Sequence, residues 1–113
     1  MEFRRVLEEY LDAVAFTEDE QLGDDCIGFH PSMFEVARTD CSNFMNLLDD
    51  EEIEYDDLGW GTFAVNFWLT RNRHGAGFWD LGLGERGDLL TKWAHSMGEL
   101  DVYLGDDGYA YFA

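Results

Sequence analysis

Apolar residues recur at helical spacing over the first fifteen residues of the chain. The positions that form this stripe are Phe3, Val6, Leu7, Tyr10, Leu11 and Val14. Charged side chains occupy the opposite face, and this separation predicts an amphipathic helix over about residues 2–15. Residues 17–30 are polar and include Gly23 and Gly28, so we expect a loop there. The acidic side chains of that loop are Glu18, Asp19, Glu20, Asp24 and Asp25.

A second helix is expected to begin near Pro31 and Ser32. Ser32 and Glu35 have the spacing of a capping box, in which each side chain satisfies a free backbone N–H of the first turn. The predicted buried stripe of this helix is Phe34, Ala37, Cys41, Phe44, Met45 and Leu48. Since both helices have one apolar face, we expect both to pack on a flat apolar surface formed by the rest of the chain.

The pattern changes in the next segment. Residues 63–70 are rich in β-branched and aromatic residues and alternate along the chain, which predicts a strand. The face that this strand would bury is Phe63, Val65, Phe67 and Leu69. Residues 71–84 contain four glycines, and we expect either a long ordered loop or a hairpin whose second strand is 77–80.

The last part of the chain predicts a helix and a hairpin. Leucines and other apolar residues favour a third helix over residues 85–98. The turn Gly105-Asp106-Asp107-Gly108 separates two short apolar runs, 101–104 and 109–112, and this arrangement is typical of a β-hairpin. The whole order predicts one α+β domain, a small antiparallel sheet with about three helices packed on one face. We expect an acidic helical half and a sheet-forming half, residues 1–58 and 59–113.

The charge of the chain is strongly negative and uneven. The 113 residues include 25 Asp or Glu and 7 Lys or Arg, a formal net charge of −18. Residues 1–58 hold 18 acidic and 3 basic side chains, whereas residues 59–113 hold 7 and 4. Direct binding to nucleic acid or to an anionic membrane is disfavoured, because both need an excess of Lys and Arg. A solvated face, adaptation to high salt and a functional acidic surface are all consistent with such acidity, but salt adaptation should coat both halves.

The densest acidic stretch, residues 49–57, holds seven carboxylates in nine residues. They are Asp49, Asp50, Glu51, Glu52, Glu54, Asp56 and Asp57, and Glu8, Glu9 and Asp12 form a further group that shares one side of the first predicted helix. A duplex presents about one negative charge per 1.7 Å of its axis, so carboxylates spaced along a surface can occupy the basic groove of a nucleic-acid-binding protein. We expect these ten residues to bind such a partner, with Ile53 and Tyr55 as exposed apolar anchors.

The glycine-rich loop offers an alternative site. Arg71, Arg73, His74 and Asp80 could together bind an anionic ligand or a protein partner. The simpler interpretation is that the glycines make a tight turn while both arginines pair with some of the many carboxylates. No catalytic set is identifiable from spacing, and residues 49–57 lack the ligand pattern of an EF-hand. We therefore expect no enzymatic activity, no cofactor and no dedicated metal site.

The two cysteines and the N-terminal sequence indicate in which cellular compartment the protein is expected. Cys41 falls on the apolar face of a predicted helix, so we expect Cys26 and Cys41 to be reduced thiols. The first residues lack the apolar core of a secretory signal, and no apolar run approaches the roughly 18–20 residues of a membrane span. These features predict a cytoplasmic protein.

The block from Trp68 to Asp80 is the most distinctive stretch of the sequence. It contains Trp68-Leu69-Thr70-Arg71-Asn72 and His74-Gly75-Ala76-Gly77-Phe78-Trp79-Asp80, separated by one residue. This block resembles the signature of a family of small bacteriophage-encoded proteins, and Asp40-Cys41 with Phe44 is also similar. The likeness extends from the second predicted helix onward. It implies a viral origin and a host-cell setting, and it transfers no catalytic residues.

Charge and resemblance together predict a phage-type acidic protein that mimics nucleic acid. Its partner would be a basic DNA- or RNA-binding host protein, in defence systems such as restriction or CRISPR or in housekeeping. A homodimer would double the length of the phosphate-like array. The alternative is a phage accessory protein that works through the Arg71–Asp80 loop.

Overall fold

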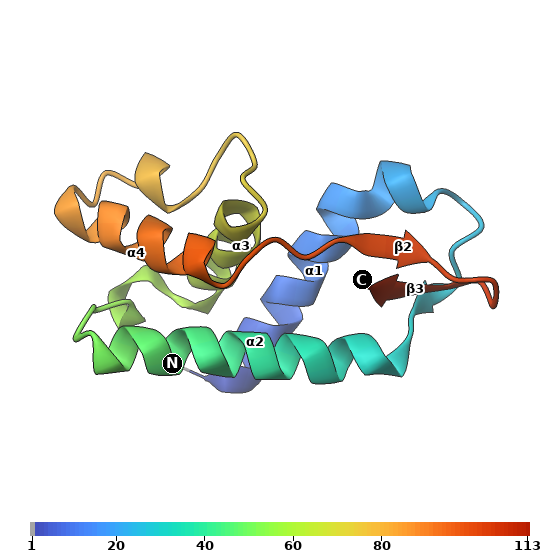
Figure 1. Cartoon of the computed structure of the whole chain (residues 1–113), viewed down its shortest axis with the longest axis horizontal. Helices are drawn as coiled ribbons and strands as arrows, with labels where there is room; N and C mark the ends of the chain where they lie inside the picture. Colours follow the sequence, from blue (N-terminus) through green and yellow to red (C-terminus); the bar gives the residue numbers. More distant parts are fainter. Residues whose placement is uncertain (1) are drawn as a thin grey trace.

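Four helices and a small three-stranded sheet make up residues 2–113, the part of the chain that the computed structural model describes. Their order and bounds are α1 (Phe3–Leu22), β1 (Gly28–Phe29), α2 (Pro31–Asp50), η1 (Asp56–Leu58), α3 (Trp60–Arg71), η2 (Phe78–Asp80), α4 (Glu85–Ser96), β2 (Val102–Leu104) and β3 (Tyr109–Phe112), where η marks a short 3-10 helix. The molecule is elongated and measures 43 × 25 × 21 Å. The sheet lies at one end of the long axis, and α3 and α4 lie at the other (Figure 1).

Helix α1 confirms the first amphipathic helix but is longer than predicted. It continues to Leu22, so much of the expected loop is helical and Glu18, Asp19 and Glu20 lie on the helix. The extension is held by core contacts: Leu22 is buried, and the indole Nε1 of Trp68 donates a hydrogen bond to Thr17 Oγ1 at 2.8 Å.

Helix α2 confirms the second amphipathic helix, with a different cap from the one predicted. His30 occupies the N-cap position, and its Nδ1 accepts a hydrogen bond from the backbone N–H of Ser32 at 3.1 Å. The capping box of Ser32 and Glu35 is therefore wrong. Pro31 at the first helical position places the preceding residue in the extended conformation that a cap requires.

The predicted strand at residues 63–70 is wrong, because the segment is part of helix α3. Its buried positions are Phe63, Ala64, Phe67, Trp68, Thr70 and Arg71. These recur mainly at i, i+1, i+4 and i+5, which is a helical pattern. The alternation of Phe63, Val65, Phe67 and Leu69 arises because the helix is apolar on most of its faces, so several spacings fit the sequence at once.

The sheet is mixed, not purely antiparallel. The predicted hairpin is confirmed, with β2 antiparallel to β3, but β1 adds a parallel strand on the other side of β3. Sheet formation is thus not confined to residues 59–113, since β1 belongs to the acidic half. The hairpin alternative for 77–80 is also wrong, since this segment is the 3-10 helix η2.

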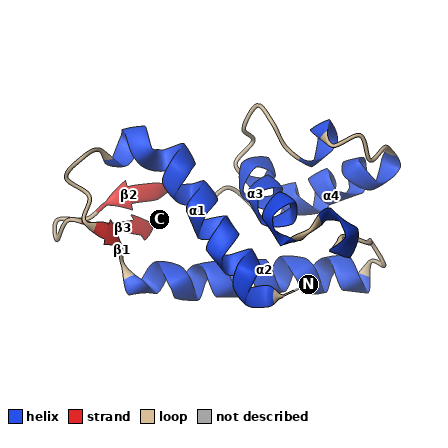
Figure 2. Cartoon of the chain, turned by 180° about the vertical axis from the view of Figure 1, so that it is seen from behind, coloured by secondary structure: helices blue, strands red, loops and turns tan. Residues whose placement is uncertain are grey.

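The helices do not lie together on one face of the sheet. Helices α1 and α2 run along opposite sides of it, and α3 packs against α1 and α4 farther along the long axis (Figure 2). Helix α4 confirms the predicted third helix. Tyr10, Phe44 and Phe67 join α1, α2 and α3 in the core: the rings of Phe44 and Phe67 stack at 4.1 Å between centroids, and Tyr10 lies 5.5 Å from Phe67.

Both thiols are free, as predicted. Cys41 is fully buried among the core residues of α2, and Cys26 is half-buried in the loop before β1. Burial, followed by the neighbouring Asp40 carboxylate, raises the pKa of Cys41 to about 12. Cys41 is therefore an inert core residue at neutral pH.

Candidate partner-binding surface

The seven carboxylates of residues 49–57 are all exposed at the end of the molecule opposite the sheet (Figure 1). Ile53 and Tyr55, however, are each only 7% exposed, so the prediction of exposed apolar anchors is wrong. The Tyr55 ring packs on Phe63 of α3 at 4.8 Å between centroids. The chain leaves α2 through a turn in which Glu52 has a φ of 58°. In residues 53–55 that follow, Ile53 and Tyr55 are buried and Glu54 between them is exposed.

Two contacts fix this acidic segment to the helices. The Arg86 guanidinium donates two hydrogen bonds to the Asp57 carboxylate, at 2.7 and 3.0 Å, and a third to the backbone oxygen of Glu54 at 3.2 Å. This pairing holds the pKa of Asp57 below its usual value. Burial, followed by the nearby Asp49 carboxylate, raises the pKa of Tyr55 to about 12. The segment is therefore a held array of carboxylates and not a free loop.

The three carboxylates expected on one side of α1 divide between two sides. Glu8 pairs with Arg4 at 3.3 Å, and both of these residues line a groove together with Asp12. Glu9 is half-buried and faces the start of α3 at Gly61. Among residues 2–113 Asp12 and Glu9 form no ion pair, and of the two Asp12 is the exposed one that a partner's cation can reach.

A second acidic group lies at the sheet end of the molecule. It is composed of Glu18, Asp19, Glu20, Asp24, Asp25, Asp106 and Asp107. The 105–108 turn meets the loop before β1, where the backbone N–H of Ile27 donates to the Gly108 oxygen at 2.8 Å. We call these seven acidic residues at the sheet end the sheet-end group, and we call residues 49–57 the acidic run. Each holds seven carboxylates, and they occupy opposite ends of the long axis (Figure 1).

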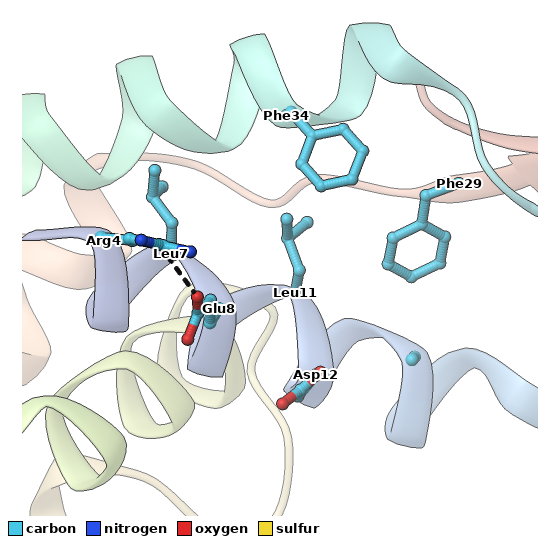
Figure 3. A pocket seen from close by; sticks show the side chains of 8 residues that line it. Arg4, Leu7, Glu8, Leu11, Asp12, Phe29 and Phe34 are labelled. Carbon is cyan, nitrogen blue, oxygen red and sulfur yellow. Dashed lines mark ion pairs between the residues drawn. The ribbon is translucent and has the colours of Figure 1, made fainter.

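An apolar groove between α1, α2 and β1 was not predicted. Leu7 and Leu11 point from α1 toward Phe34 of α2, Phe29 closes one end, and Glu8 with Asp12 lies along the outer edge (Figure 3). The groove has a volume of about 420 Å³. Phe34 was expected in the buried stripe, but it stands in the first turn of α2, where no other element covers it, and is 48% exposed.

Arg71 is a structural residue and not a free ligand-binding group. Its side chain is 3% exposed and contacts α1, α2 and the segment that follows α4. Nη1 donates to Asp40 Oδ2 at 2.7 Å and to the Tyr10 hydroxyl at 3.1 Å, while Nε and Nη2 donate to the Gly98 and Met97 backbone oxygens that follow α4. The interpretation that Arg71 pairs with a carboxylate is confirmed, and its charge is fully engaged.

The other residues of the alternative loop are also held by structural contacts. Arg73 pairs with Glu99 at 3.9 Å on the surface, as the simpler interpretation predicted. Asp80 Oδ2 accepts the backbone N–H of Gly77 at 3.2 Å and so fixes the start of η2. His74 is half-buried, with no hydrogen bond from its ring among the described residues. The geometry does not bring these four side chains together around a shared pocket.

The side chain of Trp79, in η2, is 41% exposed. Among residues 2–113 no three His, Cys, Asp or Glu side chains are placed to hold a metal ion together. In the same range, no helix combines the length and apolar character that crossing a bilayer requires.

Comparison with known proteins identifies no relative of the chain. No family model, curated protein or solved structure matches the chain. The function must therefore be inferred from the residues and their geometry.

Proposed function

We propose that this chain is a phage-type acidic protein that binds a basic nucleic-acid-binding host protein and takes the place of the nucleic acid. It acts by binding, without catalysis. The acidic run, with Glu8, Glu9 and Asp12, is the contact surface. The phage setting rests on the resemblance of the Trp68–Asp80 block, and the binding mode rests on the charge.

The density of charge along the molecule carries this proposal. The chain is 43 Å long and has a formal charge of −18. A duplex of the same length carries about 25 negative charges, at about one per 1.7 Å. The protein thus offers a basic groove a comparable linear charge, and its binding would release the same kind of counterions.

The carboxylates that make up this charge are largely unpaired. Within residues 2–113, arginines neutralise only five of them, namely Glu8, Glu35, Asp40, Asp57 and Glu99. Six of the seven in the acidic run have no cationic partner there. An array kept only for its own stability would gain from more internal ion pairs, whereas an array that meets a basic groove needs its charges free.

The test compares two variants that change the net charge equally. One converts the seven carboxylates of the acidic run to amides, and the other converts the seven of the sheet-end group. Each variant and the unchanged chain is used as bait in a bacterial lysate, at about 50 and 200 mM salt, the range over which nucleic-acid-like contacts weaken most steeply. A duplex DNA competitor is added in parallel, and the captured proteins are identified by mass spectrometry.

We expect the unchanged chain to capture basic proteins that both duplex DNA and high salt displace. The variant of the acidic run should lose them, whereas the sheet-end variant, which keeps the contact surface but lowers the overall charge equally, should retain them with lower affinity. Equal loss in both variants would show that net charge alone drives capture. Capture that survives both variants but disappears with Arg73→Ala would overturn the proposal in favour of the alternative loop; Arg71 is unsuitable for this purpose because its removal disturbs the core.

A further inference from the structure

The groove between α1 and α2 is an apolar surface that the acidic contact does not explain. Leu7, Leu11 and Ala15 line it from α1, one helical turn apart, while Phe29 and Phe34 line it from β1 and α2. Nothing covers it within the described chain, although apolar surface gains free energy when it is removed from water. Both long walls belong to helices of the core, so the groove is preformed.

The dimensions of the groove suit a helix. From Arg4 to Ala15 the wall on α1 covers eleven residue steps, about 17 Å at 1.5 Å per residue, which corresponds to about three helical turns. Residues spaced by four on α1 form a ridge, and ridges of this kind pack into the grooves of another helix. An amphipathic helix laid in such a groove is a common mode of protein recognition.

Charge selects the occupant. Glu8 and Asp12 border the groove one turn apart. Glu8 is paired at 3.3 Å with Arg4, which also lines the groove, whereas Asp12 forms no ion pair within residues 2–113. A second copy of this chain would set the same carboxylates, and a further −18 of charge, against them. A helix with Lys or Arg beside its apolar stripe would instead place a cation against the unpaired Asp12.

We propose that the groove binds an amphipathic helix of the partner protein, with basic residues flanking its apolar face. The inference rests on the proposed function, because that function requires a basic partner. It adds that the contact has an apolar part, and so explains how an acidic protein discriminates among many basic proteins. Phe16, 85% exposed, lies one turn beyond Asp12 on the same side of α1 and is an exposed apolar side chain outside the groove.

The experiment uses the full chain and two synthetic peptides of about 14 residues, long enough for about four helical turns. Both contain the same numbers of leucine and lysine. In the first the leucines recur at helical spacing, and in the second they alternate. Affinity is measured by calorimetry, and contact residues are identified from the amide NMR shifts of the isotope-labelled chain.

We expect the helical peptide to shift Leu7, Leu11, Ala15 and Phe34, and to bind more tightly than the alternating peptide. Ala15→Trp fills the groove and Phe34→Ala removes one wall. Each substitution should lower the affinity for the helical peptide about tenfold, which is comparable to the loss of one buried aromatic side chain from the contact. Leu89→Ala is the control, since Leu89 is an exposed apolar residue of α4 that does not line the groove. It should leave the affinity unchanged.

The contrary outcomes are distinguishable. Equal affinity for both peptides, with shifts confined to the acidic run, would overturn the groove proposal and leave the proposed function intact. No binding of either peptide at low salt would contradict both. A dimer seen by sedimentation and abolished by Ala15→Trp would show that a second copy, and not a basic helix, fills the groove.

Discussion

Arg71 and Arg86 each hold a carboxylate oxygen at 2.7 Å, in very different surroundings. The side chain of Arg71 is 3% exposed, and it joins α3 to Tyr10 of α1, Asp40 of α2 and the carbonyls after α4. Arg86 lies on the surface and joins α4 only to the acidic run. Both are arginine–carboxylate ion pairs. The pair of Arg71 with Asp40 connects several helices in the core, whereas the pair of Arg86 with Asp57 fixes only a local surface segment.

The difference shows how the chain tolerates its own charge. Removing one member of a buried ion pair leaves the other charge without solvent or partner, whereas an exposed charge is stabilised by water in any case. The fold places one arginine where its loss cannot be compensated. It leaves most carboxylates at the surface, where their mutual repulsion is screened by salt.

The largest expected effect is that of Arg71→Met. The substitution leaves the Asp40 carboxylate, the Tyr10 hydroxyl and two carbonyls without their donor, and we expect a loss of about 3–5 kcal/mol in the free energy of unfolding. Urea denaturation followed by tryptophan fluorescence measures this quantity. Arg73→Met is the matched control, because it breaks only an exposed pair, and it should change the stability little. A stability of Arg71→Met close to that of Arg73→Met would contradict the role assigned to Arg71.

The next largest effect concerns the turn that follows Arg71. A Cβ at Gly77 would lie 2.5 Å from the Oγ1 of buried Thr70 and 2.3 Å from Trp79 Cζ3. Thr70 cannot withdraw without losing the hydrogen bond that its Oγ1 accepts from the Phe78 N–H at 3.1 Å. We therefore expect Gly77→Ala to destabilise the chain by about 1–3 kcal/mol, as overpacking does.

Gly75→Ala provides the control for this substitution. Its Cβ would meet no atom within 4 Å, so thermal unfolding should remain at the wild-type midpoint. If the two alanine variants unfold at the same temperature, the packing at Gly77 is less rigid than the geometry indicates.

The elements that were predicted correctly are those whose sequence pattern fits only one kind of secondary structure. Helix α2 buries a single stripe and is polar elsewhere, and the hairpin around 105–108 has a turn composition that fits little else. Helix α3 was missed because it is apolar on most faces, so alternation and helical spacing both described it. Strand β1 was missed because two residues are too few to show an alternation of apolar and polar positions. Its pairing partner also lies some eighty positions later in the chain.

The same reasoning explains the outcome at the candidate site. Exposure of the carboxylates followed from their charge, but the inward direction of Ile53 and Tyr55 depends on where Phe63 lies in space. The partners of Arg71 come from α1, from α2 and from the segment after α4, so no local spacing could identify them.

The smallest expected effect belongs to the surface pair and depends on pH. The folded-state pKa of Asp57 is lowered, first by its hydrogen bonds to Arg86. A lowered pKa stabilises the folded state above the unfolded value, about 3.9, and that stabilisation is lost as the pH falls through the folded value. The difference in unfolding free energy between the unchanged chain and Asp57→Asn should thus be constant from pH 7 to about pH 5 and disappear at more acidic pH.

Asp56→Asn is the control that distinguishes the loss of the Asp57–Arg86 ion pair from the loss of one negative charge. Both substitutions remove one negative charge from η1, but Asp56 forms no ion pair within residues 2–113. Asp56→Asn should therefore leave stability unchanged or raise it slightly, since it only relieves repulsion, whereas Asp57→Asn should lower it by less than Gly77→Ala does. If both variants were stabilised equally, the ion pair of Arg86 with Asp57 would add nothing to stability, and the acidic run would be held by the burial of Ile53 and Tyr55 and by the hydrogen bond of Arg86 to the Glu54 carbonyl.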